Sequence, residues 1–189
     1  MPGEKNGRKQ QPAGEYHYPE AYGFTPFMVG YIHEGRKNMP AVLVVPGGAY
    51  RHVAPSESDI PAEEFYNLGY NVFVLVYTVN YLDTPLKMQP LNDISRAVRI
   101  MRKHCGQFGV DPEKIAVCGF SAGGHLCASL CVHWRDVRDP LEDYRDTENR
   151  PDAALLCYPV ITSGKYANRN SFCALLGAKP DEEETKKDS

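Results

Sequence analysis

A serine flanked by glycines is the feature of this sequence that most directly indicates chemistry. It lies in the run Gly119-Phe120-Ser121-Ala122-Gly123-Gly124. The apolar residues 115–118 precede this run and a helical pattern follows it, so the serine is expected on a sharp turn from a strand into a helix. At such a turn a base can reach the hydroxyl, and the helix N-terminus faces the oxygen that becomes negative when a carbonyl is attacked. We therefore predict Ser121 as a catalytic nucleophile.

A second glycine-rich segment fits the other requirement of that chemistry. Ester hydrolysis needs N–H donors aimed at the negative oxygen of the tetrahedral intermediate. The segment Pro46-Gly47-Gly48-Ala49-Tyr50 follows the apolar run 41–45, and its glycines let the backbone approach a substrate closely. We predict the backbone N–H groups of Gly48, Ala49 and Ala122 as the donors. The alternatives are a plain strand-to-helix turn and a phosphate-binding loop, and the second is disfavoured because no Lys-Ser or Lys-Thr pair follows the glycines.

The sequence offers no well-placed base for Ser121. In this arrangement the acid and then the histidine follow the serine along the chain, and only His125 and His133 do so here. His125 lies one turn into the helix that begins at the serine, so its side chain belongs to that same helix and is not brought to the serine from a separate loop. His52, which follows the glycine segment, is the remaining alternative.

Three carboxylates are better explained by structure than by catalysis. Asp93 and Asp111 are predicted to cap a helix or a turn. Asp152 precedes a predicted strand, whereas a site in a parallel sheet forms where strands end.

Alternating apolar strands and amphipathic helices predict an α/β fold with a mostly parallel sheet covered on both faces. Buried strands are predicted at 41–45, 72–77, 115–118 and 153–158, and an edge strand at 27–32. Helices are predicted at 56–68, 91–108 and 122–134. In the first helix Phe65 and Leu68 face inward, and Gly69 ends it in a left-handed conformation.

The remaining segments are predicted from composition. We expect a flexible N-terminal arm at 1–24, one domain at 25–178 and a charged tail at 179–189. The charged stretch 135–150 is expected to be a surface excursion. Four basic residues on the second helix are expected to form its solvated face: Arg96, Arg99, Arg102 and Lys103.

Composition excludes several classes of partner. The 189 residues are 42% hydrophobic and carry a formal net charge of -3, which gives no reason to expect nucleic acid or an anionic membrane as a partner. No apolar run approaches the roughly 20 residues that cross a bilayer, and the N-terminus lacks the apolar region of a signal peptide. We expect a soluble, cytoplasmic protein. The six cysteines lack paired spacing and are expected to be reduced, with neither a metal nor another cofactor.

Three segments, 46–51, 69–75 and 111–126, resemble α/β-hydrolases of the bacterial carbohydrate acetylesterase group. This group resembles acetyl xylan esterases and the wider hormone-sensitive-lipase-like enzymes, and the similarity runs from about Thr25 to Leu176. The resemblance implies the α/β-hydrolase fold and a serine esterase that removes small acyl groups, such as acetyl from decorated sugars, through an acyl-serine intermediate. It implies no cofactor.

The sequence departs from this group at two places. Ala49 stands where many relatives have a third glycine, and the relatives continue through two further strands whose loops carry the acid and the histidine. Only Ser121 and the backbone donors are carried over, and we expect a C-terminally truncated domain without the acid and histidine of a triad. The strand at 153–158 would then expose an apolar edge that favours self-association. Two alternatives stay open: a non-catalytic domain that binds only a ligand or partner, and an enzyme whose base comes from His52 or a second chain.

Overall fold

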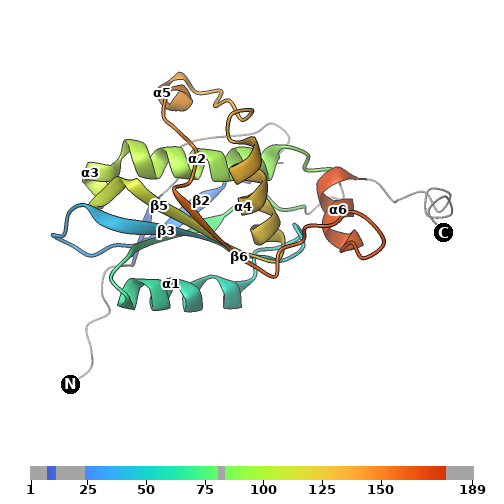
Figure 1. Cartoon of the computed structure of the whole chain (residues 1–189), viewed down its shortest axis with the longest axis horizontal. Helices are drawn as coiled ribbons and strands as arrows, with labels where there is room; N and C mark the ends of the chain where they lie inside the picture. The colour runs from blue at the N-terminus through green and yellow to red at the C-terminus, as the bar shows by residue number, and fades with distance from the viewer. Residues whose placement is uncertain (1–7, 12–23, 81–83, 178–189) are drawn as a thin grey trace.

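The computed structural model describes residues 8–11, 24–80 and 84–177, which form a six-stranded sheet in the order β1-β2-β4-β3-β5-β6 (Figure 1). The strands are β1 Arg8–Gln11, β2 Phe27–Tyr31, β3 Met39–Val45, β4 Asn71–Val76, β5 Val110–Phe120 and β6 Ala153–Cys157. The first two strands pair antiparallel, as do β2 and β4, whereas β4, β3, β5 and β6 run parallel. The predicted α/β fold with a mostly parallel sheet is confirmed.

Helices cover both faces of the sheet (Figure 1). On one face lies α1 Asp59–Asn67, preceded by the 3-10 helix η2 Pro55–Glu57, and on the other lie α2 Gln89–Lys103 and α4 Ala122–His133. The shorter helices are α3 Cys105–Phe108, α5 Glu142–Arg145 and α6 Arg169–Leu176. Because strand side chains alternate, Leu43 packs in the cluster of α2 and α4, and Val42 packs with Ala62 and Phe65 of α1.

Two glycines let α4 begin directly against the sheet. A Cβ placed on Gly123 would lie 2.0 Å from the carbonyl oxygen of Val45 in β3, and one on Gly119 would lie 2.4 Å from the carbonyl oxygen of Gly123. No side chain fits at such distances, so these positions allow the tight turn from β5 into α4. The predicted strand, serine turn and helix are therefore present, with a strand longer than predicted.

The first helix and the N-terminal segment differ from prediction in part. Gly69 has a φ of 94°, as expected for the residue after the helix. Leu68 was predicted to face inward, and this is wrong: it is the residue directly after α1 and is 73% exposed. Arg8–Gln11 form β1 within the segment expected to be a flexible arm, and the tail 179–189 lies outside the described residues.

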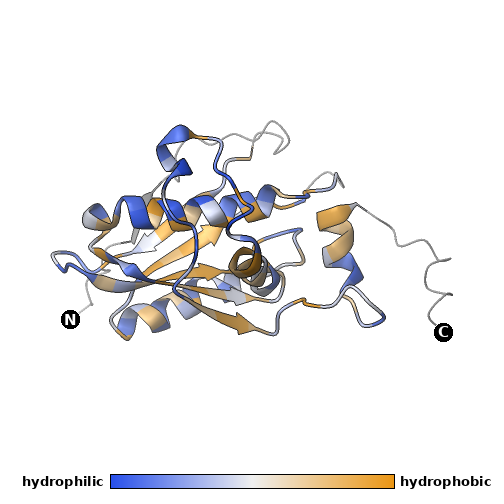
Figure 2. Cartoon of the chain, turned by 45° about the horizontal axis from the view of Figure 1, so that its top comes forward, coloured by the Kyte–Doolittle hydropathy of each residue, from blue (hydrophilic) through white to orange (hydrophobic). Residues whose placement is uncertain are grey.

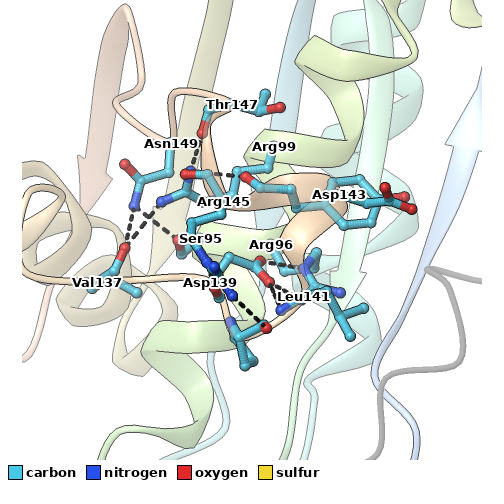
Figure 3. A network of polar contacts seen from close by, with 12 residues as sticks. Ser95, Arg96, Arg99, Val137, Asp139, Leu141, Asp143, Arg145, Thr147 and Asn149 are labelled. Carbon is cyan, nitrogen blue, oxygen red and sulfur yellow. Dashed lines mark hydrogen bonds and ion pairs between the residues drawn. The ribbon is translucent and has the colours of Figure 1, made fainter.

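Of the four basic residues of α2 that were predicted to form a solvated face, Lys103 is exposed as expected, whereas the three arginines are buried or half-buried. Arg96 and Arg99 are buried, with exposed fractions of 3% and 5%. The Arg96 guanidinium pairs with Asp139, and Arg99 donates to backbone carbonyls of residues 137–147 (Figure 3). Arg102 donates to the carbonyls of Glu148 and Arg150 at 2.9 and 3.0 Å. The excursion 135–150 is thus anchored on α2 by arginines.

The strand β6 was predicted to be buried, and this is wrong. It lies at the edge of the described sheet, and Leu155 and Leu156 are 42% and 41% exposed. Figure 2 shows this strand in hydrophobic colours at the rim of the sheet, whereas α5 is hydrophilic. The expectation of an exposed apolar edge is confirmed for the described residues, because β6 has a neighbour on one side only. No helix in the described part of the chain is both long and apolar enough for a membrane span.

Candidate active site

Ser121 joins β5 to α4 in a strained backbone conformation. Its φ is 50° and its ψ is -114°, a region that non-glycine residues occupy at a cost of about 1–3 kcal/mol. The Ser121 N–H donates to the Cys157 carbonyl at 3.0 Å, and its carbonyl accepts from the N–H groups of His125 and Val160, each at 3.1 Å. The Ser121 hydroxyl makes no hydrogen bond with any described residue. The backbone is therefore fixed on both sides while the hydroxyl stays available for reaction.

The glycine segment after β3 is a strained loop beside the serine, hereafter the Gly47–Tyr50 loop. Gly48, Ala49 and Tyr50 have φ values of 125°, 55° and 59°. The Tyr77 hydroxyl donates to the Pro46 carbonyl at 2.8 Å before the loop, and the Asn80 N–H donates to the Tyr50 carbonyl at 2.7 Å at its end. Strained backbone persists where its surroundings hold it, and these two bonds hold the loop at both ends.

The loop and the serine are in direct proximity. A Cβ placed on Gly47 would lie 2.9 Å from Ser121 Cβ and 2.8 Å from the Phe120 carbonyl oxygen. Only a glycine therefore lets the loop pass this close to the nucleophile turn. The two segments that the sequence singled out meet at the carboxyl edge of the sheet.

The backbone donors predicted for an oxyanion differ from their neighbours in hydrogen bonding. In the described part of the chain, the N–H groups of Gly48, Ala49 and Ala122 have no hydrogen-bond acceptor, whereas those of Gly47 and Ser121 donate to Glu57 and Cys157. Ala122 is the first residue of α4, where N–H groups lack partners within the helix. The three groups are available to a ligand, and their role as donors to an oxyanion stays a prediction.

None of the described histidines hydrogen-bonds to the Ser121 hydroxyl. His125 Nδ1 shares a hydrogen bond of 2.7 Å with the Tyr50 hydroxyl, and its ring packs against Phe172. Burial lowers the pKa of the His125 imidazole, which favours its neutral form. His52 and His133 are exposed, and His133 Nδ1 lies 3.2 Å from the Asp136 carboxylate. His125 thus supports the Gly47–Tyr50 loop through Tyr50.

The carboxylates named from the sequence have structural partners. Asp111 accepts the Glu113 N–H at 3.1 Å, as predicted for a turn, and Asp152 accepts the Ile115 N–H at 2.9 Å. The prediction that Asp93 caps α2 is wrong, because this helix begins at Gln89 and the carboxylate reaches across to accept the N–H of Thr78 at 2.8 Å. Burial raises the pKa of Asp93 to about 7.

Glu57 belongs to the site although sequence reasoning did not single it out. Its Oε2 accepts the Gly47 N–H at 2.7 Å, and its Oε1 accepts the Tyr158 hydroxyl at 2.8 Å. The same Cβ placed on Gly47 would lie 2.7 Å from Glu57 Oε2, so the carboxylate and Ser121 both lie next to the Cα of Gly47. No periodicity or motif marks Glu57, because its partners are a backbone group and a distant tyrosine.

No group of His, Cys, Asp and Glu side chains among the described residues could hold a metal ion. A cavity of about 370 Å³ is lined by residues 32–37 and 106–109. These segments precede β3 and β5, so the cavity lies at the edge of the sheet opposite to Ser121. It therefore adds nothing to the site around the serine.

A mostly parallel sheet covered by helices, with a serine turn at the end of a central strand, defines an α/β hydrolase. A solved structure that is similar to this chain is also an α/β hydrolase. The BD-FAE family model matches residues 31–160, which is more than half of the chain, and the chain belongs to this family.

Two curated relatives are named as a xylanase and an acetylxylan esterase. The chain is 46% identical over 171 residues to endo-1,4-beta-xylanase B of Butyrivibrio fibrisolvens, covering 90% of this chain and 27% of the relative. It is 28% identical over 134 residues to the acetylxylan esterase of Xylanibacter ruminicola, covering 70% of this chain and 25% of that protein. The chain thus spans about a quarter of the length of these curated relatives.

A solved structure is similar over nearly the whole chain. The acetyl ester-xyloside bifunctional hydrolase of Caldicellulosiruptor lactoaceticus superposes with a TM-score of 0.80 at 35% identity, covering 94% of this chain and 66% of that one. The resemblance to α/β-hydrolases of the carbohydrate esterase group is therefore confirmed.

Proposed function

We propose that this chain is the nucleophile-bearing part of a serine esterase that hydrolyses esters of small acyl groups, with acetylated carbohydrates as its substrate class. The observation that carries the proposal is the strained Ser121, whose free hydroxyl stands beside a loop with unpartnered N–H groups. The names of the relatives, an acetylxylan esterase and an acetyl ester-xyloside hydrolase, support acetyl as the acyl group.

In this proposal Ser121 Oγ attacks the carbonyl carbon of the ester, and the carbonyl oxygen becomes negative. That oxygen accepts hydrogen bonds from the N–H groups of Gly48, Ala49 and Ala122, which are stronger in the transition state than in the ground state. The C–O bond to the alcohol then breaks, and the alcohol takes the proton that the serine lost. Water then attacks the carbonyl carbon of the acyl-serine and loses a proton, the bond from that carbon to Ser121 Oγ breaks, the serine takes up the proton, and the carboxylic acid leaves.

A base must carry the serine proton to the leaving alcohol. Because no described histidine bonds to the Ser121 hydroxyl, we place this base outside the described residues. Loss of the histidine from a serine triad lowers turnover about a millionfold, with a residue of catalysis left by the oxyanion donors. Turnover by this chain alone therefore depends on whether a base is supplied.

The test is hydrolysis of p-nitrophenyl acetate by the chain and by Ser121→Ala, with circular dichroism to show that both fold. Serine-dependent turnover or a serine-dependent burst of nitrophenol supports the proposal. Equal rates from the two folded proteins contradict it for this chain and favour the second candidate.

The second candidate is a non-catalytic α/β-hydrolase-like domain that binds a ligand or a partner. The same Ser121 hydroxyl without a described base favours it. We also propose that β6 is a self-association edge, since Leu155 and Leu156 expose apolar surface along a strand with one neighbour.

A further inference from the structure

Glu57 has no part in the mechanism above, yet it bridges the two loops on either side of the nucleophile. One oxygen accepts the Gly47 N–H at the exit from β3, and the other accepts the Tyr158 hydroxyl just after β6. In the sheet, β3 and β6 are the two neighbours of β5, at whose end Ser121 lies. The carboxylate therefore spans the end of the nucleophile strand.

The charge of Glu57 makes this position unexpected for an oxyanion site. A carboxylate near a developing negative charge opposes it, and no Lys, Arg or His forms an ion pair with Glu57 in the described part of the chain. Both oxygens instead accept hydrogen bonds. The hydrogen bond to Glu57 raises the pKa of Tyr158 to about 12, so this tyrosine keeps its proton and remains a donor. The contacts thus explain the carboxylate as an acceptor that orders backbone.

Both segments that Glu57 contacts are strained. Six non-glycine residues have a positive φ among the residues described, and four of them surround the site: Ala49, Tyr50, Ser121 and Tyr158. Such conformations persist only when other contacts hold them. Glu57 supplies a contact to both loops at once.

We propose that Glu57 is a positioning residue that holds the Gly47–Tyr50 loop in place through the Gly47 N–H and ties it to the loop after β6 through Tyr158. The proposal rests on the esterase function proposed above. With Gly47 fixed, the unpartnered N–H groups of the next two residues, Gly48 and Ala49, are held in place for an oxyanion. Without Glu57 the loop relaxes and these donors lose their alignment.

The test compares four variants in the full chain. Glu57→Ala removes both hydrogen bonds, Glu57→Gln keeps an acceptor oxygen for Gly47, and Tyr158→Phe removes only the second bond. Glu63→Ala is the matched control, because it removes an exposed carboxylate of α1 that bonds to neither loop. The readouts are kcat and KM, or the burst rate constant, for p-nitrophenyl acetate, with the midpoint of thermal unfolding.

Glu57→Ala is expected to lower kcat by about tenfold to a hundredfold with KM changed less than about threefold, since loss of one oxyanion donor costs about 10²–10³ in kcat. Glu57→Gln is expected to restore most of the rate, and Glu63→Ala to leave it unchanged. An unchanged kcat in a Glu57→Ala variant, beside a Ser121→Ala variant without turnover, overturns the role of Glu57 and leaves the esterase function standing.

If the chain shows no serine-dependent reaction, the esterase function fails for it and amide exchange decides the role of Glu57. The Gly47 N–H is then expected to exchange at least about tenfold faster in Glu57→Ala than in the parent chain or in Glu63→Ala. Equal Gly47 exchange in all three proteins overturns the proposal.

Discussion

Replacing Asp93 by asparagine is expected to remove a pH-dependent part of the free energy of unfolding. Burial raises the pKa of this carboxyl from 3.8 to about 7, and the side chain is 3% exposed. Between pH 3.8 and about pH 7, the Asp93 carboxyl is therefore protonated in the folded protein and ionised in the unfolded chain. Stability from this group is fully present below about pH 4 and is lost as the pH rises through about 7. Asparagine keeps an acceptor for the Thr78 N–H, so the variant tests the ionisation and spares the hydrogen bond.

The magnitude follows from the shift in pKa. Each pKa unit corresponds to about 1.4 kcal/mol, so the full effect of Asp93 is about 4 kcal/mol, of which about 2–3 kcal/mol falls between pH 5 and pH 8. Urea unfolding of the parent chain and Asp93→Asn at both pH values measures it. The stability of the variant relative to the parent should rise by that amount from pH 5 to pH 8. A difference that stays constant within about 0.5 kcal/mol would refute a raised pKa for Asp93.

Three further predictions concern the fold. Gly123→Ala should prevent folding or cost several kcal/mol, because its Cβ would lie 2.0 Å from a β3 carbonyl oxygen. In the control Gly106→Ala the added Cβ meets no atom within 4 Å, so the free energy of unfolding should change by less than about 1 kcal/mol. Chemical denaturation compares the two variants. Arg96→Met should cost about 3–5 kcal/mol by leaving Asp139 buried without its partner, and limited proteolysis should then cut the 135–150 excursion faster; an uncut excursion contradicts the anchoring role. Leu155→Glu should reduce self-association in sedimentation velocity, since it places charge on the β6 edge, and a protein that is monomeric before the change contradicts that edge as an interface.

The sequence predicted those parts of the fold that depend on local pattern. The apolar runs of β3, β4 and β5 and the glycines around Ser121 report burial and close approach within a few residues, and both were found where expected. The predictions that failed depend on distant partners. Arg96 and Arg99 are typical of a solvated helix face until the excursion 135–150 folds over them with its own carbonyls.

The residues of the site also divide into those that a local motif marks and those that depend on distant partners. Ser121 and the Gly47–Tyr50 loop each carry a short motif, so the sequence could bring them to the same edge of the sheet. Glu57 and Asp93 are single acidic residues, and each accepts a backbone N–H of another segment. A backbone N–H is present at nearly every position, so no residue type in the sequence marks such a partner.

The residues that hold the Gly47–Tyr50 loop in place through hydrogen bonds are positions where mutations should affect activity although the residues do not contact a substrate. Glu57, Tyr77, Asn80 and His125 contact this loop or the residue before it, from three places in the chain. Of these contacts, the one from Asn80 is a backbone N–H, so its alignment depends on the segment 77–80, which Asp93 holds through Thr78. Burial opposes the ionisation of Asp93 although the charge strengthens the bond from the Thr78 N–H, so above about pH 7 the segment 77–80, and with it the Tyr50 end of the loop, should become less stable. If so, serine-dependent acylation should lose rate above about pH 7 in the parent chain and less in Asp93→Asn, and identical pH profiles would show that this segment does not transmit the change.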